Sequence, residues 1–525
     1  MPMRALCTAG AISLMLLACS KAPEAPASPQ PAIAWVRPEG ASLEAVFAQA
    51  RQADKPVFLY WGAVWCPPCN QIKATVFNRP DFAERSKSFI AVYLDGDTPG
   101  AQKLGAQFKV RGYPTMILFK PDGSELTRLP GEVDAAKYME VLGLALNAGA
   151  SVKASLAAAL GKDAAALSPQ AWRQLAYYAW EQDEAQLAPE AQRAATLRKL
   201  AKACPSLQPE AASRLALKAI AATAQDKAVL PERPQALALT RAVLADAALA
   251  RVNFDTLVYY GNEIVGSLSG AGSAERKSLT AEWLQALSRF AADTQLARSD
   301  RLSAVAAKIA LARLDLPEGA RPRLEPALVA EARAAASRAE RETSDRFERQ
   351  AVLPGAADLL SDAGLFDESD ALLNAELPKA VSPYYHMLVL AANARARGDK
   401  PAALAWSERA WNESAGPATR LQWGSSHVGR LIELAPQDAA RIEKAAGGVI
   451  AELEAAPETF YERNRRGLEK MAKRLRTWSD KGHHEPVLRK LGEQLEQVCA
   501  RLPAQDEARK ACSGVFNPRP GAQKA

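Results

Sequence analysis

The feature that most constrains the fold is a pair of cysteines with two prolines between them, in the stretch YWGAVWCPPCNQIK (60–73). The run PVFLYWG (56–62) before it is continuously apolar, as in a strand covered on both faces. After it, Cys69, Ile72 and Val76 fall at helical spacing. The first cysteine therefore lies where a strand passes into a helix, and backbone N–H groups at a helix N-terminus favour an anion.

The position of Cys66 at the start of a helix suits thiol–disulfide exchange. The thiolate is the form of cysteine that attacks disulfides, so Cys66 is the candidate nucleophile. Cys69 lies one helical turn further on and faces the same way, so it can resolve a mixed disulfide formed by Cys66.

Two other uses of the pair are open, a structural disulfide and a zinc site. Zinc needs about four ligands, and the chain has no second pair of this spacing. We expect no metal, because the four histidines lie far from the motif in the sequence: His386, His427, His483 and His484.

The chain around the motif alternates helical and strand patterns. The expected order is αβαβαββα, which indicates an α/β domain. Besides the motif helix, the expected elements are a helix over 42–54, strands over 56–62 and 89–95, a helix over 99–108, a hairpin of 115–119 and 124–129, and a helix over 134–146.

These residues resemble the thioredoxin superfamily over about a fifth of the chain. Trp65 precedes the first cysteine as in the family, and RGYPT places Pro114 where the family has a cis-proline. The stretch TVFNRPDF (75–82) is similar to the soluble terminal domain of the transmembrane disulfide reductase. The resemblance implies a thioredoxin-like domain over 39–150, in which Trp65, Tyr113 and Pro114 help to dock the extended backbone of a partner.

The sequence departs from the family at two positions. Many thioredoxins bury an acid six positions before the first cysteine, where this chain has Tyr60, and the lysine that often accompanies the acid aligns with Ala91. Loss of the proton from the second thiol is then expected to be slow or to use water.

The two prolines also change the surroundings of the first sulfur. Pro67 and Pro68 have no N–H, so only Cys69 and Asn70 can supply donors to Cys66 from this turn. A less stabilised thiolate makes the dithiol more reducing. We therefore expect a potential nearer about −270 mV than about −120 mV.

The N-terminus has the features of a secretory leader. Residues 1–18 hold one early charge and an apolar run too short to span a bilayer. The last residues before Cys19 resemble a bacterial lipobox, which implies cleavage there and a lipid on the Cys19 sulfur; a plain signal peptide is the alternative. The proline-rich segment 19–38 is expected to be an extended tether. Ser20 favours outer-membrane over inner-membrane sorting of a periplasmic lipoprotein.

Beyond residue 150 the strand patterns stop, and 151–515 is expected to be an all-α helical-hairpin domain. Gly364 and Gly398 lie 34 residues apart, which is the tetratricopeptide period, so repeats of that type are expected near 350–415. Stacked hairpins often form a concave protein-binding surface, whereas a plain helical domain has none. Residues 516–525 are expected to form a flexible tail.

Three more cysteines lie in the helical region. Cys499 and Cys512 have twelve residues between them, and an oxidising compartment favours a structural disulfide, with two free thiols as the alternative. Cys204 is then unpaired and is expected to act as a small buried hydrophobe.

The sequence thus predicts a periplasmic thiol–disulfide oxidoreductase that reduces or exchanges protein disulfides. It needs no organic cofactor, and a membrane dithiol reductase is expected to supply its electrons. The alternative is an envelope scaffold, in which helical repeats bind partners and the thioredoxin-like domain docks them or senses redox state. The net charge is +7, and basic and acidic residues are interleaved along the chain, so we expect no nucleic-acid partner.

Overall fold

The computed structural model describes most of the chain, namely residues 33–38, 42–98, 100–183, 186–317, 320, 322–454 and 456–516. The predicted signal peptide, Cys19, residues 19–32 of the predicted tether and residues 517–525 of the predicted tail lie outside the described residues. Among the described residues, every helix is too short or too polar to cross a bilayer.

Four strands form one mixed sheet in the order β2-β1-β3-β4. The central strand β1 (Val57–Gly62) runs parallel to β2 (Ile90–Asp95) and antiparallel to β3 (Thr115–Phe119), which pairs antiparallel with β4 (Glu125–Leu129). Every residue of β1 is buried, so the expected cover on both of its faces is confirmed, and every residue of β3 is buried as well.

The helices around the sheet confirm the predicted order of elements. The helix after the cysteines is less regular than expected, because α2 passes into a π-helical segment, η1, before α3 begins. The bounds are α1 Glu44–Ala53, α2 Pro67–Ile72, η1 Lys73–Phe77, α3 Pro80–Arg85, η2 Ser86–Ser88, α4 Ala101–Gln107 and α5 Ala135–Leu146.

Residues 33–38 pack on this domain, although the proline content of 19–38 predicts a free tether. Val36 forms a parallel bridge with Val92 at the edge of the sheet. The Trp35 ring lies 5.1 Å from the Phe77 ring, centroid to centroid. A tryptophan gains too much from burial to stay in an extended linker, so the packed chain begins before the first helix.

The remaining elements of the described residues are all helical, as predicted. The first part contains α6 Val152–Leu160, η3 Ala164–Ala166, α7 Pro169–Tyr177, η4 Trp180–Gln182, α8 Glu190–Ala203, α9 Pro209–Gln225, α10 Arg233–Ala245, α11 Ala247–Val252, α12 Phe254–Tyr259, α13 Gly261–Leu268, α14 Ala274–Ala292, α15 Arg298–Arg313, α16 Pro326–Glu342 and α17 Arg346–Asp362. The second part contains α18 Phe366–Glu376, α19 Pro383–Ala396, α20 Lys400–Glu413, α21 Pro417–Leu434, α22 Ala439–Ala451, η5 Pro457–Phe460, α23 Glu462–Gly482, α24 Glu485–Cys499 and α25 Glu507–Gly514.

The two glycines that suggested a repeat have the same backbone conformation. Gly364 lies between α17 and α18, Gly398 lies between α19 and α20, and each has φ +82°. A side chain is disfavoured there, which explains why both turns use glycine. The tetratricopeptide type of these hairpins stays a prediction.

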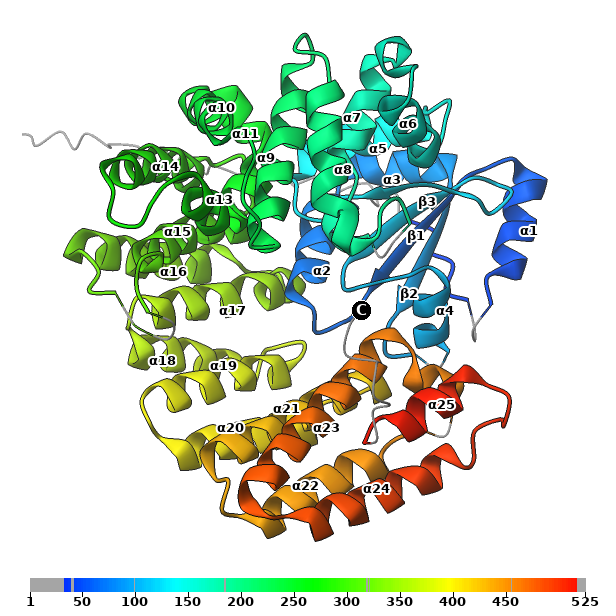
Figure 1. Ribbon diagram of the computed structural model, residues 1–525, viewed down its shortest axis with the longest axis vertical. Coiled ribbons are helices and arrows are strands. Elements are labelled where there is room, and N and C mark those ends of the chain that lie inside the picture. Colours follow the sequence, from blue (N-terminus) through cyan, green and yellow to red (C-terminus); the bar gives the residue numbers. More distant parts are fainter. Residues whose placement is uncertain are drawn as a thin grey trace, which may run out of the picture.

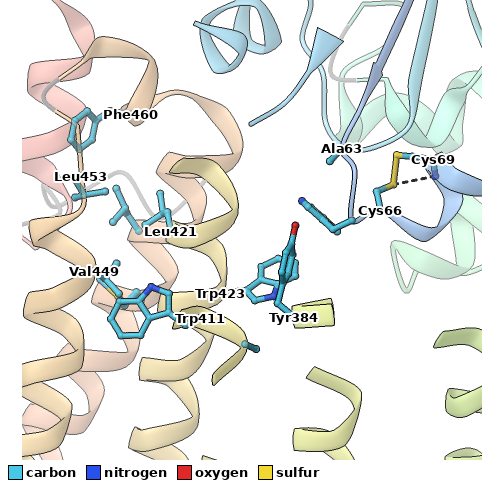
Figure 2. Close-up of a cluster of buried hydrophobic side chains, with 14 of the residues drawn as sticks. Ala63, Cys66, Cys69, Tyr384, Trp411, Leu421, Trp423, Val449, Leu453 and Phe460 are labelled. Atoms are coloured by element: carbon cyan, nitrogen blue, oxygen red, sulfur yellow. Dashed lines mark hydrogen bonds between the residues drawn. A yellow bond between two sulfur atoms is a disulfide. The ribbon is translucent and has the colours of Figure 1, made fainter. Parts of the chain in front are cut away.

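The helical region curves around the thioredoxin-like part of the chain (Figure 1). Helix α17 packs beside α2, and the chain then returns so that α23 and η5 pack against α4. We call residues 383–516, which contain α19 to α25, the C-terminal arm. One hydrophobic cluster continues from the cysteine pair into this arm, so the two parts share a core (Figure 2).

Candidate active site

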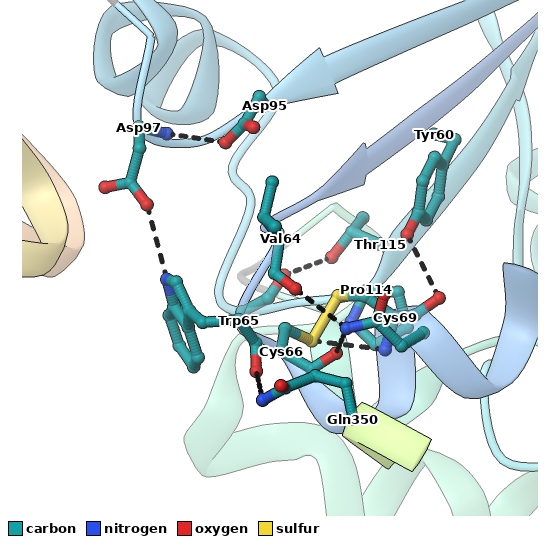
Figure 3. Close-up of a disulfide and its surroundings, with 12 residues drawn as sticks. Tyr60, Val64, Trp65, Cys66, Cys69, Asp95, Asp97, Pro114, Thr115 and Gln350 are labelled. Atoms are coloured by element: carbon teal, nitrogen blue, oxygen red, sulfur yellow. Dashed lines mark hydrogen bonds between the residues drawn. A yellow bond between two sulfur atoms is a disulfide. The ribbon is translucent and has the colours of Figure 1, made fainter. Parts of the chain in front are cut away.

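The cysteine pair opens helix α2. Cys66 is the N-cap residue, Pro67 and Pro68 take the first two helical positions, and Cys69 follows. Prolines fit there because the first N–H groups of a helix have no helical partner. Cys66 and Cys69 are joined by a disulfide, with Cα atoms 5.2 Å apart (Figure 3).

One backbone donor reaches the first sulfur. The Cys69 N–H donates to Cys66 Sγ over 3.2 Å. The sequence allowed Asn70 as a second donor, but the Asn70 N–H donates to the Cys66 carbonyl over 3.1 Å, in the first hydrogen bond of the helix. The Asn70 side chain donates to the Val64 and Cys66 carbonyls, which fixes the loop rather than the sulfur.

The predicted proline loop belongs to the immediate surroundings of the disulfide (Figure 3). The Tyr113–Pro114 peptide bond is cis. A Cβ atom added to Gly131 would lie 3.3 Å from Pro114 Cγ, so a glycine lets the chain after β4 approach the loop closely. The Pro114 carbonyl accepts a hydrogen bond of 3.0 Å from Gln182 Nε2, in η4 of the helical region.

The two positions that depart from the family supply no proton acceptor. The Tyr60 hydroxyl donates to the Cys69 carbonyl over 3.4 Å. Burial raises the pKa of Tyr60 well above its usual value, because a tyrosinate is poorly solvated there, so the hydroxyl keeps its proton at neutral pH. Ala91 lies on β2 opposite Phe58 and has no ionisable group.

Trp65 is held on its outer side by an aspartate that the sequence does not mark as a site residue. Trp65 Nε1 donates to Asp97 Oδ2 over 3.3 Å. The same carboxylate accepts from the Thr419 backbone N–H at 2.8 Å and from Thr419 Oγ1 at 2.6 Å. Burial raises the pKa of Asp97, and these hydrogen bonds oppose the rise. Nothing in the local sequence marks this contact, since its partners are 322 positions apart.

The sulfurs are covered although their loop reaches the surface. Cys66 is 2% exposed and Cys69 is 0% exposed, whereas Val64 is 40% exposed. Trp65 and Pro114 are buried as well, and Tyr113 is half-buried. The structure therefore brings together all five predicted residues of this site and covers them with helices from the rest of the chain.

The other cysteines lie away from this site. Cys499 and Cys512 form a second disulfide between α24 and α25, and both are completely buried. Cys204 is a free, buried cysteine, and burial raises its pKa to about 11, so it stays a neutral thiol.

The described residues contain no cluster of three or more side chains suited to bind a metal ion. His386 and His427 are buried, and burial lowers the pKa of each to about 4, so both are neutral at pH 7. His483 and His484 lie at the start of α24, near the surface.

Mixed sheet, cis-proline and cysteine pair together define a thioredoxin-like domain. The family model described as a thioredoxin-like domain matches residues 43–145. The domain is homologous to thiol:disulfide interchange proteins DsbD. It is similar to DsbD 1 of Pseudomonas aeruginosa (36% identity over 106 residues, 19% of this chain and 18% of the relative), and to DsbD of Pseudomonas fluorescens (35% over 104 residues, 19% and 18%).

The likeness covers only part of each protein. The chain spans about a fifth of the length of these curated relatives, and the same holds for DsbD of Vibrio vulnificus (34% identity over 103 residues, 19% of this chain and 17% of the relative). A solved structure of a DsbH oxidoreductase matches 24% of this chain and 94% of its own length, with 22% identity and a TM-score of 0.20.

Proposed function

We propose that the protein is a periplasmic thiol–disulfide oxidoreductase in which Cys66 attacks and Cys69 resolves. The observation that carries this proposal is the Cys66–Cys69 disulfide at the start of α2, whose first sulfur accepts a backbone N–H. The same N–H can stabilise a Cys66 thiolate after reduction. The similarity to thiol:disulfide interchange proteins supports this use of the pair.

The reaction transfers two electrons to a protein disulfide. The reduced Cys66 thiolate attacks one sulfur of the client, and the other client sulfur leaves as a thiolate that takes up a proton. Cys69 loses its proton to water and attacks Cys66, which restores the disulfide and releases the second client sulfur as a thiolate that takes up a proton from water. Trp65, Tyr113 and Pro114 form the surface on which the client backbone docks.

The oxidised pair then needs two electrons from another dithiol. A membrane dithiol reductase is the proposed donor, since the curated relatives are thiol:disulfide interchange proteins. We also propose that Cys19 carries a lipid that anchors the protein, preferably at the outer membrane. Loss of palmitate labelling in Cys19→Ala tests the anchor separately from the exchange reaction.

Trapping tests the exchange reaction. Cys69→Ser leaves the mixed disulfide on Cys66 unresolved, so discrete client proteins are expected to stay bound and to be released by reductant. Cys66→Ser is the matched control and should trap none. The wild-type protein should also reduce insulin in the presence of excess dithiol.

The alternative is an envelope scaffold with a docking or redox-sensing domain. The helical region covers the cysteine pair, and Cys66 is only 2% exposed. This burial favours the scaffold. An empty Cys69→Ser trap, together with no insulin reduction by the wild-type protein, would support the scaffold and reject the oxidoreductase.

A further inference from the structure

The C-terminal arm covers the surface around Trp65 on which a client would dock. The Trp65 ring is stacked on Tyr385 at 5.9 Å with an interplanar angle of 17°, and it meets Trp423 edge-on at 4.9 Å. The Arg463 guanidinium lies 5.3 Å from the Trp65 ring centre and 4.7 Å from that of Tyr113. Two aromatic rings and a cation of the same chain therefore fill the place of a protein partner.

A polar contact fastens the arm beside these rings. Thr419 is in the first turn of α21, where a backbone N–H has no helical partner, and Asp97 accepts that N–H. The thioredoxin-like domain thus supplies the N-terminal cap of a helix in the arm. Gly416 permits the approach, because a Cβ atom there would lie 2.5 Å from Asp97 Cβ. Trp65 donates to the same carboxylate, so the contact is linked directly to the active-site loop.

Helices outside the arm hold the backbone of the same two loops. Gln350 Nε2 of α17 lies 3.5 Å from the Trp65 carbonyl, and Gln350 Oε1 accepts the Ser382 N–H just before α19. On the other side, Gln182 donates to the Pro114 carbonyl. The helical region thus covers the active-site loops from η4 onwards along the chain. Within this cover, the arm is the part that contacts the Trp65 ring.

We propose that the C-terminal arm selects the reaction partner of the cysteine pair, so that small thiols react with the closed protein and a protein dithiol reacts only after the arm has left Trp65 and Asp97. This inference rests on the proposed function. A protein partner must place its sulfur against Cys66 and its backbone against Trp65 and Tyr113. The arm already occupies the surface of Trp65 and Tyr113. A small thiol needs only to reach the small part of Cys66 that stays exposed, in a loop where Val64 and Pro68 reach solvent.

The chemical step is the same for both partners. The attacking thiolate bonds to Cys66 Sγ, the Cys66–Cys69 bond breaks, and Cys69 leaves as a thiolate that takes up a proton. A second thiol then displaces Cys66, so the reductant loses two electrons as its own disulfide forms. The arm changes which partners can reach Cys66. It does not change the bonds that form and break or the number of electrons transferred.

The test compares two reductants on the full-length oxidised protein. Dithiothreitol is the small reductant, and a reduced thioredoxin in large excess is the protein reductant. Thr419→Val removes the hydroxyl donor to Asp97 and keeps the size of the side chain. Thr477→Val is the matched control, because Thr477 Oγ1 donates within α23 to the Lys473 carbonyl. Arg463→Gln is a second variant, which removes the cation above both rings.

The readout is the ratio of the two reduction rates, followed by maleimide labelling of the freed cysteines. Thr419→Val is expected to raise the rate with thioredoxin about tenfold, since a lost hydrogen bond to a carboxylate increases the opened population by about that factor. Its rate with dithiothreitol should stay within about twofold, and so should both rates of Thr477→Val.

Three other results would contradict either the selection of partners by the arm or the proposed function. If Thr419→Val and Arg463→Gln both leave the ratio of rates at the wild-type value, the arm does not select partners. If dithiothreitol and thioredoxin speed up equally, the cover limits access to the sulfur itself and selection between partners is wrong. If neither reductant opens the Cys66–Cys69 bond in any variant, the proposed function fails instead.

Discussion

The two disulfides in the described part of the chain lie at opposite ends of their helices. Cys66 caps the N-terminus of α2, and its sulfur accepts a backbone N–H. Cys499 is the last residue of α24, and Cys512 lies in the last turn of α25. The N-terminal end of a helix carries partial positive charge and the C-terminal end partial negative charge, so a thiolate is favoured at Cys66 and disfavoured at the other two. Under the proposed function, this difference in placement is what makes Cys66–Cys69 the exchanging disulfide and Cys499–Cys512 the structural one.

The largest expected effect is on exchange. Cys66→Ser should lower insulin reduction to the uncatalysed background, because the attacking sulfur is gone. Cys512→Ser should keep the activity, since that disulfide lies between two helices of the arm. The initial rate of insulin precipitation measures both. Equal loss in the two variants would mean that the second disulfide also takes part in catalysis.

Stability should show the reverse pattern. Replacing both Cys499 and Cys512 by alanine opens a loop of 13 residues, which is expected to lower the free energy of unfolding by about 3 kcal/mol. Replacing Cys66 and Cys69 together should cost less, since they are only 3 positions apart and close a very short loop. Denaturant titrations of the two double variants compare these costs. A larger loss at Cys66 and Cys69 would contradict the structural role of the second disulfide.

A smaller effect concerns the prolines. A helix N-cap side chain accepts from the second or third helical N–H, so Pro68→Ala adds a donor to Cys66 Sγ and Pro67→Ala does not. A bond that favours the thiolate by about 1.4 kcal/mol should raise the reduction potential by about 30 mV in Pro68→Ala. Equilibration with glutathione measures the shift, with Pro67→Ala as control. Equal shifts would show that loop rigidity, rather than the N–H, sets the potential.

The smallest effect is expected at Tyr60. Its hydroxyl keeps its proton because burial raises its pKa, so Tyr60→Phe should leave the resolution of the mixed disulfide within about twofold of the wild-type rate. Stopped-flow mixing of the reduced protein with a small disulfide measures that step. A large slowing would reveal a role for this hydroxyl in proton transfer to or from Cys69.

The sequence predicts the thioredoxin-like part well, because its signals are local. Strand burial, the cysteine spacing and the proline loop each occupy a few consecutive residues. The π-helical segment η1 was not predicted, since its residues also fit an α-helix. The prolines before Trp35 are the stronger local signal, so the sequence does not predict that Trp35 packs on the domain.

The cover over the site has no local signal at all. Asp97 and Thr419 are 322 positions apart, and Trp423 sits in an ordinary helical pattern. Such contacts depend on how successive helices turn the chain back towards α4, and helical periodicity does not encode that path. The candidate nucleophile was therefore predictable, whereas its burial was not.

One measurement tests the central claim most directly. The folded protein is equilibrated in glutathione buffers of decreasing potential, and differential alkylation with peptide mass mapping reports both disulfides in the same molecules. We expect Cys66–Cys69 to open with a midpoint near about −270 mV, while Cys499–Cys512 stays closed to below about −300 mV. Opening of both disulfides at one potential, or a Cys66–Cys69 midpoint above about −180 mV, would contradict the account.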